Sequence, residues 1–237
     1  MVLKTSQLCY QLGSKTLLAG IDLTLHSGRF YGILGLNGAG KTTLLKLLTA
    51  IWRPTSGCVE WGGDNLQTYS RLQIGRLLSL VPQHTLSPFP LLAVDLVRMG
   101  LYASGICHAE AEERVQSALM QVNSWEMRHR FISTLSAGER QRIYIARSLA
   151  SRSQVHLLDE PVACLDLPHR KGLWRLLRGV ADSGKCVIAT LHDFQEALPY
   201  LDTLIFLHQG RCVGVTHPGS LEAVHLLHTL FDYKSPV

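Results

Sequence analysis

The sequence lacks any apolar run long enough to cross a membrane. Its longest apolar stretches, such as 44–52, are short and are interrupted by Lys46 and Thr49, whereas a spanning helix needs roughly 20 apolar residues. The first ten residues also lack the apolar centre of a secretory signal. These absences predict a cytoplasmic protein, or one that is attached to a membrane only through its partners.

Clustered cysteines and long basic runs are missing as well. The six cysteines are dispersed, with no Cys-x-x-Cys pair and no Cys/His metal spacing. We therefore expect reduced cysteines rather than a disulfide framework, which is typical of small secreted chains. The net charge of +5 permits contact with nucleotides, nucleic acid or an anionic membrane. Without a run of five or more basic residues, charge alone decides nothing.

The 237 residues, of which 46% are hydrophobic and 17% charged, fit one globular domain. Apolar residues at every second position predict β-structure over 1–30, and helices are expected over 44–51 and much of 90–130. Further strands are expected at 30–34, 77–81, 155–158, 187–191 and 203–207. Because strands alternate with helices, we predict an α/β sheet. The nucleotide-binding core would comprise 1–83 and 151–237, with 84–150 as an inserted helical subdomain.

A glycine-rich segment carries the first chemical signal. Gly35-Leu-Asn-Gly-Ala-Gly-Lys-Thr42 matches G-x-x-x-x-G-K-[ST] at every fixed position, between an expected strand and an expected helix. Its glycines allow backbone N–H groups to converge on an anion at the positive end of that helix. Lys41 would then reach the β- and γ-phosphates, and the Thr42 hydroxyl would hold Mg²⁺. The segment predicts a nucleoside triphosphate site.

Two carboxylates follow the apolar strand expected at 155–158. At the carboxyl edge of a parallel sheet, Asp159 and Glu160 would emerge beside the phosphate loop. Asp159 is suited to Mg²⁺, and Glu160 is suited to orient and deprotonate the attacking water. Within the strand, we expect His156 to be a neutral, hydrogen-bonded core residue rather than a ligand.

A second phosphate-binding surface is indicated by Leu135-Ser-Ala-Gly-Glu139. Ser136 is placed to cap a helix whose first turn offers free N–H groups, and Gly138 lies beside them. A single chain does not need two such surfaces for one ATP. We therefore predict that this second surface serves the ATP of another copy in a homodimer.

With these segments the chain resembles the ABC (ATP-binding cassette) ATPase family over nearly its full length. Residues 35–42 look like the Walker A loop, 155–160 like the Walker B strand and 135–139 like the signature LSGGQ, with Ala137 and Glu139 as departures. Ala163-Cys-Leu-Asp166 resembles the D-loop. The resemblance implies a P-loop (RecA-like) α/β core with an N-terminal antiparallel β part and an inserted helical subdomain.

The resemblance also implies roles for single residues. Gln83 looks like the Q-loop glutamine that touches Mg²⁺, and His192 like the switch histidine that contacts the γ-phosphate. Leu12 occupies the slot where the family usually stacks adenine on an aromatic ring, and Tyr10 is an alternative for that contact. Expected catalytic residues are Lys41, Glu160 and His192, and expected Mg²⁺ ligands are Thr42, Gln83 and Asp159. Expected nucleotide-binding residues are Tyr10, Leu12, Gly35, Leu36, Asn37, Gly38, Ala39, Gly40, Lys41, Thr42, Thr43, Gln83, Ser136, Ala137, Gly138, Glu139 and Asp166.

The stretch from Val81 to Gly100, with His84 and Pro88 in it, looks like ATPases of iron–siderophore, haem or cobalamin importers. Such a chain would act at the cytoplasmic face of the inner membrane, with membrane permeases and, indirectly, a solute-binding protein as partners. A zinc or manganese importer ATPase and an exporter ATPase are alternatives. A non-transport ABC ATPase would be expected to carry a long coiled-coil insertion or a second cassette, and the sequence shows neither. We therefore predict no nucleic-acid partner.

Overall fold

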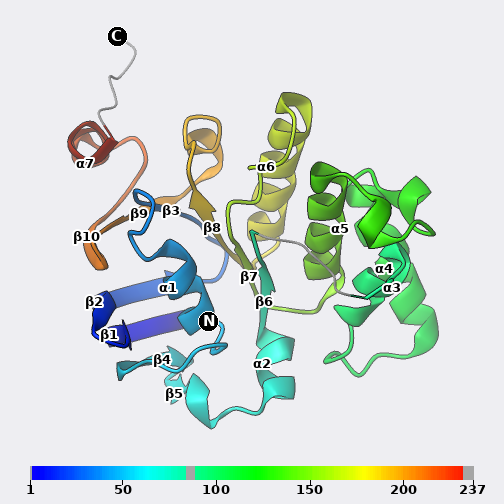
Figure 1. Ribbon diagram of the computed structural model, residues 1–237, viewed down its shortest axis with the longest axis horizontal. Coiled ribbons are helices and arrows are strands. Elements are labelled where there is room, and N and C mark those ends of the chain that lie inside the picture. Colours follow the sequence, from blue (N-terminus) through cyan, green and yellow to red (C-terminus); the bar gives the residue numbers. More distant parts are fainter. Residues whose placement is uncertain (1, 84–88, 232–237) are drawn as a thin grey trace.

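The strands form two sheets. The computed structural model describes residues 2–83 and 89–231 (Figure 1). One sheet is antiparallel with strand order β2-β1-β4-β5, and the other has the order β10-β9-β3-β8-β7-β6. The strands are β1 (Val2–Leu12), β2 (Lys15–His26), β3 (Phe30–Leu34), β4 (Ser56–Trp61), β5 (Asp64–Asn65), β6 (Leu78–Val81), β7 (Val155–Leu158), β8 (Cys186–Leu191), β9 (Thr203–His208) and β10 (Arg211–Thr216).

Helices occupy the connections between these strands. They are α1 (Lys41–Leu48), α2 (Arg71–Leu77), α3 (Ala93–Met99), α4 (His108–Gln121), α5 (Ala137–Ala150), α6 (Leu167–Asp182) and α7 (Leu221–Phe231). Within the described residues, no helix is both long and apolar enough to span a bilayer.

The larger sheet brings the predicted motifs to one edge. Strands β6, β7, β8, β3 and β9 pair in parallel, and only β10 joins antiparallel. The carboxyl ends of parallel strands meet at a single edge of a sheet. Gln83 follows β6, Asp159 follows β7, His192 follows β8 and the phosphate loop follows β3. Four motifs that are distant in sequence therefore converge.

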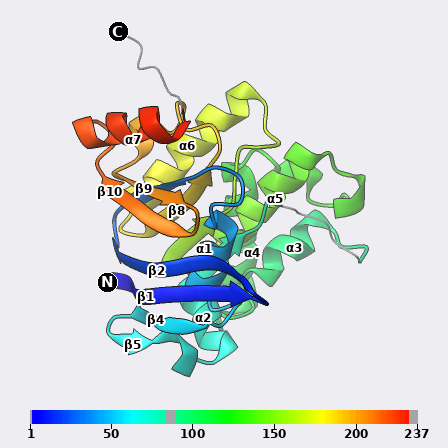
Figure 2. The ribbon, with the colours of Figure 1, turned by 60° about the vertical axis from the view of Figure 1, so that its left-hand side comes forward.

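Alternating strand residues divide the core into two clusters, one on each face of the larger sheet. Ile33 and Leu157 pack with α1 and the antiparallel sheet, whereas Leu34 and Leu158 pack with α5 and α6. Figure 2 shows the antiparallel sheet below α1, with α6 and α7 on the opposite side of the molecule. The parallel strands are buried on both faces, which explains their continuous apolar sequences.

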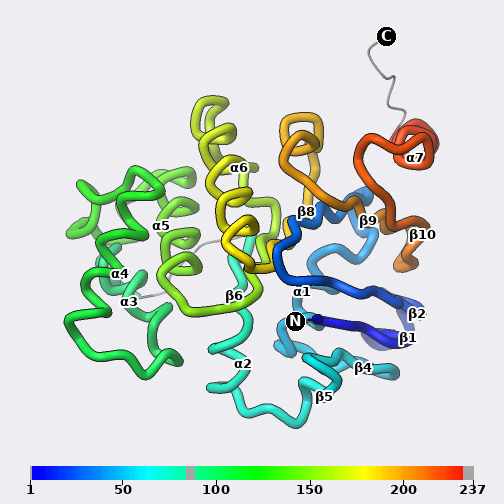
Figure 3. Tube along the Cα trace, turned by 180° about the vertical axis from the view of Figure 1, so that it is seen from behind, coloured from blue at the N-terminus to red at the C-terminus, as the bar shows by residue number. Residues whose placement is uncertain are grey.

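Helices α3, α4 and α5 gather at one end of the molecule, beyond α6 (Figure 3). They follow one another in the chain between β6 and β7. An ion pair joins α3 to α4, with Arg98 Nε 2.8 Å from Glu112 Oε1. The division of the chain into a core and a helical subdomain at 84–150 stays a prediction.

The structure refines several sequence-based boundaries. Helix α1 ends at Leu48 instead of continuing to Ile51, because Ala50 adopts a left-handed backbone conformation with φ 51°. The helical region expected over 90–130 is broken between α3 and α4, where Gly105 has φ 69°. Strands β4 and β10 and helix α7 were not expected from the sequence. His84 and Pro88 of the importer-like stretch lie outside the described residues.

The structure bears on two expectations, one about the cysteines and one about His156. All six cysteines are free thiols. His156 is 1% exposed, and its Nδ1 lies 2.9 Å from Ser148 Oγ and 3.2 Å from Ser79 Oγ. Burial, together with the nearby Lys185 ammonium, lowers the pKa of His156 from 6.5 to about 3. The imidazole is therefore a neutral, hydrogen-bonded core group at neutral pH.

Candidate nucleotide-binding site

The phosphate loop leaves β3 and enters α1 through a tight glycine-dependent turn. Gly40 immediately precedes α1 with φ 103°, and a Cβ there would lie 2.6 Å from Leu18 Cδ2 and 3.0 Å from the Leu17 carbonyl oxygen. A side chain is therefore excluded by both backbone conformation and space. The amino end of α1 offers its free N–H groups at this turn, as an anion site requires.

Lys41 is folded back over the loop. Its Nζ donates a 2.7 Å hydrogen bond to the Gly35 carbonyl oxygen and lies 4.0 Å from Glu160 Oε1. Burial lowers the pKa of this ammonium, and the nearby carboxylates of Glu160 and Asp159 oppose that shift. The ammonium lies where a phosphate oxygen could replace the Gly35 carbonyl as its partner.

A cavity of about 500 Å³ opens above the loop. It is lined by Lys15, Leu17, Leu36, Asn37, Gly38, Ala39, Gly40, Lys41, Thr42, Thr43, Gln83, Glu160 and His192. The structure thus brings most of the predicted phosphate-side residues together, with His192 from the end of β8 and Gln83 from the end of β6. Asp159 and Gly35 lie beneath this lining and contact it through hydrogen bonds.

Asp159 joins three elements through its two carboxylate oxygens. Oδ2 accepts a 2.7 Å hydrogen bond from Thr42 Oγ1 on α1, and Oδ1 accepts one of 2.7 Å from Thr190 Oγ1 on β8. The side chain is almost completely buried. Its orientation is therefore fixed relative to both the phosphate loop and the strand that precedes His192.

Glu160 follows in an uncommon backbone conformation with φ 47°. Its N–H donates to Thr190 Oγ1 at 2.8 Å, and its Oε2 accepts a 2.8 Å hydrogen bond from Gln83 Nε2. A left-handed conformation costs energy in a residue other than glycine and is often found at functional sites. Here it turns the carboxylate of Glu160 into the cavity instead of continuing the strand.

The second phosphate-binding surface predicted from the sequence lies at the amino end of α5. Ser136 Oγ accepts a hydrogen bond from the Glu139 N–H at 3.2 Å, and Glu139 Oε2 accepts one from the Ser136 N–H at 2.7 Å. The second of these bonds lowers the pKa of Glu139, and Arg130 contributes to the same shift. The Ser136 oxygen is thus an acceptor in this capping box, which leaves the hydroxyl hydrogen available to an anion.

This surface forms a hollow of its own, of about 390 Å³, that also contains Asp166. Gly138 is required there because a Cβ would lie 2.7 Å from the Cys164 carbonyl oxygen. Asp166 contacts His169 on α6, and this hydrogen bond lowers the pKa of the Asp166 carboxyl. None of the residues that line this hollow also lines the phosphate cavity.

The two candidates for base contact lie outside the cavity lining. The Tyr10 ring stacks on Trp52, with ring centroids 5.1 Å apart, and Leu12 is 62% exposed near the end of β1. Contact of either side chain with a base stays a prediction. Sequence reasoning missed Lys15 and Leu17, which line the cavity from β2. A lysine near the start of that strand was the available signal.

Thr190 was also missed, although its hydroxyl bonds both carboxylate-bearing residues. The available signal was a hydroxyl-bearing residue in an otherwise apolar strand, two positions before His192. Hydroxyl groups in buried strands usually find partners close by.

The expected Mg²⁺ ligands have the right chemistry for that ion. Thr42, Gln83 and Asp159 supply hydroxyl, amide and carboxylate oxygens, which are hard donors of the kind that Mg²⁺ prefers. No cluster of three His, Cys, Asp or Glu side chains that could hold a metal occurs among residues 2–83 and 89–231. Mg²⁺ is commonly held by one or two carboxylates together with substrate phosphates.

Comparison with known proteins places the chain among transport ATPases. The sequence profile of the ABC transporter family matches residues 18–163. The chain is 35% identical over 236 residues to the hemin import ATP-binding protein HmuV of Rhodopseudomonas palustris (strain HaA2), covering 96% of this chain and 89% of that protein. It is 34% identical over 216 residues to the protein of the same name from Photobacterium damsela subsp. piscicida, covering 89% and 82%.

Solved structures share the fold. An ATP-binding subunit of an ABC transporter superposes with a TM-score of 0.86 at 21% identity, covering 99% of this chain and 96% of that one. A dimeric bacterial ABC transporter cassette superposes with a TM-score of 0.83 at 24% identity, covering 92% and 100%. Likeness at these identities shows the architecture alone.

Proposed function

This chain belongs to the ABC transporter family, and from that premise we propose that it powers import of haem or another iron chelate through separate membrane subunits. Its family membership makes it an ATP-binding protein and an ATPase. We place two copies in a head-to-tail dimer, peripheral to a membrane permease at the cytoplasmic face of the membrane. A solute-binding protein would deliver the cargo from the other side.

One observation supports the proposed dimer. The chain has two separate hollows, the cavity above Lys41 and the hollow around Ser136, and they share no lining residue. A triphosphate in the cavity of one copy would still expose its outer face. The Ser136 hydroxyl and the N–H groups of α5 from a second copy complement that face chemically. ATP would then hold the dimer closed, and loss of the γ-phosphate would allow it to open.

Hydrolysis would be carried out by residues at the carboxyl edge of the larger sheet. Glu160 would accept a proton from the attacking water, while Gln83 holds its other carboxylate oxygen in place. Lys41 would stabilise charge on the β- and γ-phosphates, and His192 would contact the γ-phosphate from the end of β8. When bound, Mg²⁺ would neutralise phosphate charge, with Thr42, Gln83 and Asp159 as the residues that hold it.

The composite site is tested by mixing two defective variants. Lys41→Ala disables the phosphate cavity, whereas Ser136→Asp retains a capping oxygen but places a carboxylate where the phosphate would lie. Each variant alone should lose turnover. A mixed dimer contains one intact cavity facing one intact signature surface, so mixing should restore ATP hydrolysis. If mixing restores nothing, the two surfaces do not meet across a dimer.

The role of Glu160 is tested separately. Glu160→Gln should retain ATP binding, lose hydrolysis and accumulate as a dimer, because the amide keeps the shape of the site but cannot accept the proton. Light scattering with and without ATP measures the dimer. Undiminished turnover in this variant would remove Glu160 from its assigned role.

The cargo assignment is supported by relatives named as hemin import ATP-binding proteins, at up to 35% identity over most of both chains. Uptake should be measured in cells that lack this chain and in cells complemented with it. We expect loss and recovery of haem or iron-chelate uptake, with cobalamin, zinc and manganese uptake unchanged. A defect confined to zinc or manganese would favour the alternative metal-ion importer.

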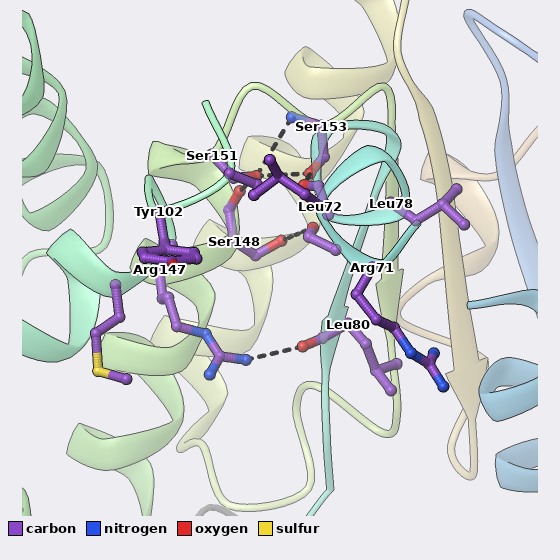
Figure 4. Close-up of a pocket in the computed structure, with 14 residues that line it drawn as sticks. Arg71, Leu72, Leu78, Leu80, Tyr102, Arg147, Ser148, Ser151 and Ser153 are labelled. Atoms are coloured by element: carbon purple, nitrogen blue, oxygen red, sulfur yellow. Dashed lines mark hydrogen bonds between the residues drawn. The ribbon is translucent and has the colours of Figure 1, made fainter. Parts of the chain in front are cut away.

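The permease would dock beside helices α3 and α5, in a cavity of about 650 Å³ that α2, β6, the end of α3 and α5 line (Figure 4). Tyr102 is 87% exposed and Met99 57% exposed at its rim. Arg147 is fixed across the cavity by a 3.0 Å bond to the Leu80 carbonyl oxygen. Because β6 leads to Gln83, a partner here would be near the ATP site. Identifying the membrane protein that co-purifies with the parent chain, but not with Tyr102→Asp, tests this placement.

A further inference from the structure

We infer that Thr190 is a positioning residue for hydrolysis, because its single hydroxyl group fixes both the Asp159 side chain and the Glu160 backbone. The inference rests on the proposed roles of these two carboxylates. Thr190 lies in β8, the central strand between β3 and β7, and it is fully buried.

The hydroxyl uses both of its hydrogen-bonding functions. It donates its hydrogen to Asp159 Oδ1 at 2.7 Å and accepts the N–H of Glu160 at 2.8 Å. A hydroxyl group has one donor and can accept at the same time, so neither bond excludes the other. No apolar side chain could replace either bond, and a buried polar group that loses its partner is costly.

The bond to the Glu160 N–H has a specific consequence. Glu160 has φ 47°, a conformation that needs support from its surroundings. The Thr190 oxygen supplies that support at the point where β7 ends and the carboxylate turns into the cavity. Without it, the backbone could relax towards an extended conformation and carry the carboxylate away from the water that it activates.

The bond to Asp159 completes a chain of contacts across the site. Thr42 Oγ1 holds the other oxygen of the same carboxylate at 2.7 Å. The phosphate loop, the end of β7 and the end of β8 are therefore joined through Asp159. His192 follows directly after β8, two positions beyond Thr190, so the hydroxyl also ties the strand that leads to His192 to the end of β7.

Two substitutions separate the hydroxyl from the packing of the side chain. Thr190→Val keeps the shape and removes the hydroxyl, whereas Thr190→Ser keeps the hydroxyl and removes only the methyl group. Small misplacements of catalytic groups can cost on the order of 100-fold in rate. We expect Thr190→Val to lower kcat by about 10- to 100-fold with the KM for ATP within about threefold of the parent. Thr190→Ser should keep kcat within about threefold of the parent.

A second readout does not depend on turnover. If Thr190→Val binds ATP but hydrolyses it slowly, it should accumulate as an ATP-bound dimer in light scattering, as expected for Glu160→Gln. A general loss of structure would instead lower the melting temperature and ATP binding together, without dimer accumulation, and would contradict the inference. So would a kcat of Thr190→Val close to that of the parent.

The serine variant supplies a test that does not depend on the folding of Thr190→Val. A loss of kcat in Thr190→Ser beyond about 10-fold would show that the methyl group, and not the hydroxyl, is needed. Failure of this inference remains distinct from failure of the proposed function. If Glu160→Gln abolishes hydrolysis while Thr190→Val hydrolyses ATP at about the parent rate, only the positioning role of Thr190 is refuted. If Glu160→Gln retains hydrolysis, the assignment on which both depend is wrong.

Discussion

The buried His156 makes a quantitative prediction about stability and pH. In the folded chain its pKa is about 3, whereas its ordinary value is 6.5. Between these two pH values the unfolded chain binds a proton that the folded chain does not. Stability is therefore fully present above pH 6.5 and is lost as the pH falls towards 3. Each pH unit in this window corresponds to about 1.4 kcal/mol.

The structure explains why protonation is resisted. The Lys185 ammonium lies 3.4 Å from Nε2 and can only donate, so Nε2 is the acceptor and Nδ1 carries the proton towards the serines. A proton on Nε2 would face this cation without access to water. Burial is the larger cause of the shift and the Lys185 charge the smaller.

The substitution His156→Asn tests this reasoning, because the amide nitrogen of asparagine can take the place of Nδ1 against Ser148 but does not titrate. Free energies of unfolding should be measured from urea titrations followed by tryptophan fluorescence at pH 7 and pH 5. The stability of the parent relative to His156→Asn should fall by about 2 kcal/mol between these pH values. The exposed His225 lies outside the core, so His225→Asn serves as a matched control for the substitution itself. A parent-to-variant difference that stays constant between pH 7 and 5 would refute the argument.

Four further substitutions, at three positions, test the proposed phosphate-binding surfaces. Lys41→Ala should weaken ATP binding by about 10- to 100-fold in isothermal titration, since a charge-assisted hydrogen bond is lost; unchanged affinity would contradict the assignment. Gly40→Ala should lower stability by about 1–3 kcal/mol in urea unfolding, because the added Cβ would meet Leu18 in a strained conformation; a neutral effect would show that the turn can adjust. Glu139→Gln should keep the capping box and the parent stability, whereas Glu139→Ala should lose about 1 kcal/mol by the same assay; equal losses would show that the bond to Ser136 contributes nothing.

The parts of the site that follow a fixed spacing could be predicted from sequence. The phosphate loop is local, because one turn contains the glycines, Lys41 and Thr42. Asp159 could be placed beside it because parallel strands end at a common edge. His156 could be assigned to the core because it stands within an apolar strand.

Contacts that depend on packing between distant segments could not be predicted. The cavity includes Lys15 because β2 lies against the amino end of α1, where Leu18 closes on Gly40. Thr190 meets Asp159 through the parallel pairing of β7 with β8, in which Leu158 lies opposite Ala189. A one-residue change in that register would direct the hydroxyl to another neighbour, and sequence alone does not fix the register. No sequence motif indicated the C-terminal helix α7.

The two proposed phosphate-binding surfaces differ in how their polar groups are satisfied. On the cavity side, Lys41 bonds the Gly35 carbonyl, Thr42 bonds Asp159, and Gln83 bonds Glu160. A triphosphate with its metal ion would replace the bond of Lys41 to Gly35 and compete for the Thr42 hydroxyl, while the bond of Gln83 to Glu160 would stay in place. On the signature side, the capping box uses the Ser136 oxygen and leaves its hydrogen uncommitted. An anion at this surface would accept a hydrogen bond from the Ser136 hydroxyl without displacing the Glu139 N–H. Under the proposed mechanism, the cavity would therefore be a preformed site for the nucleotide, and closure of the dimer would depend on the contacts that the second surface gains.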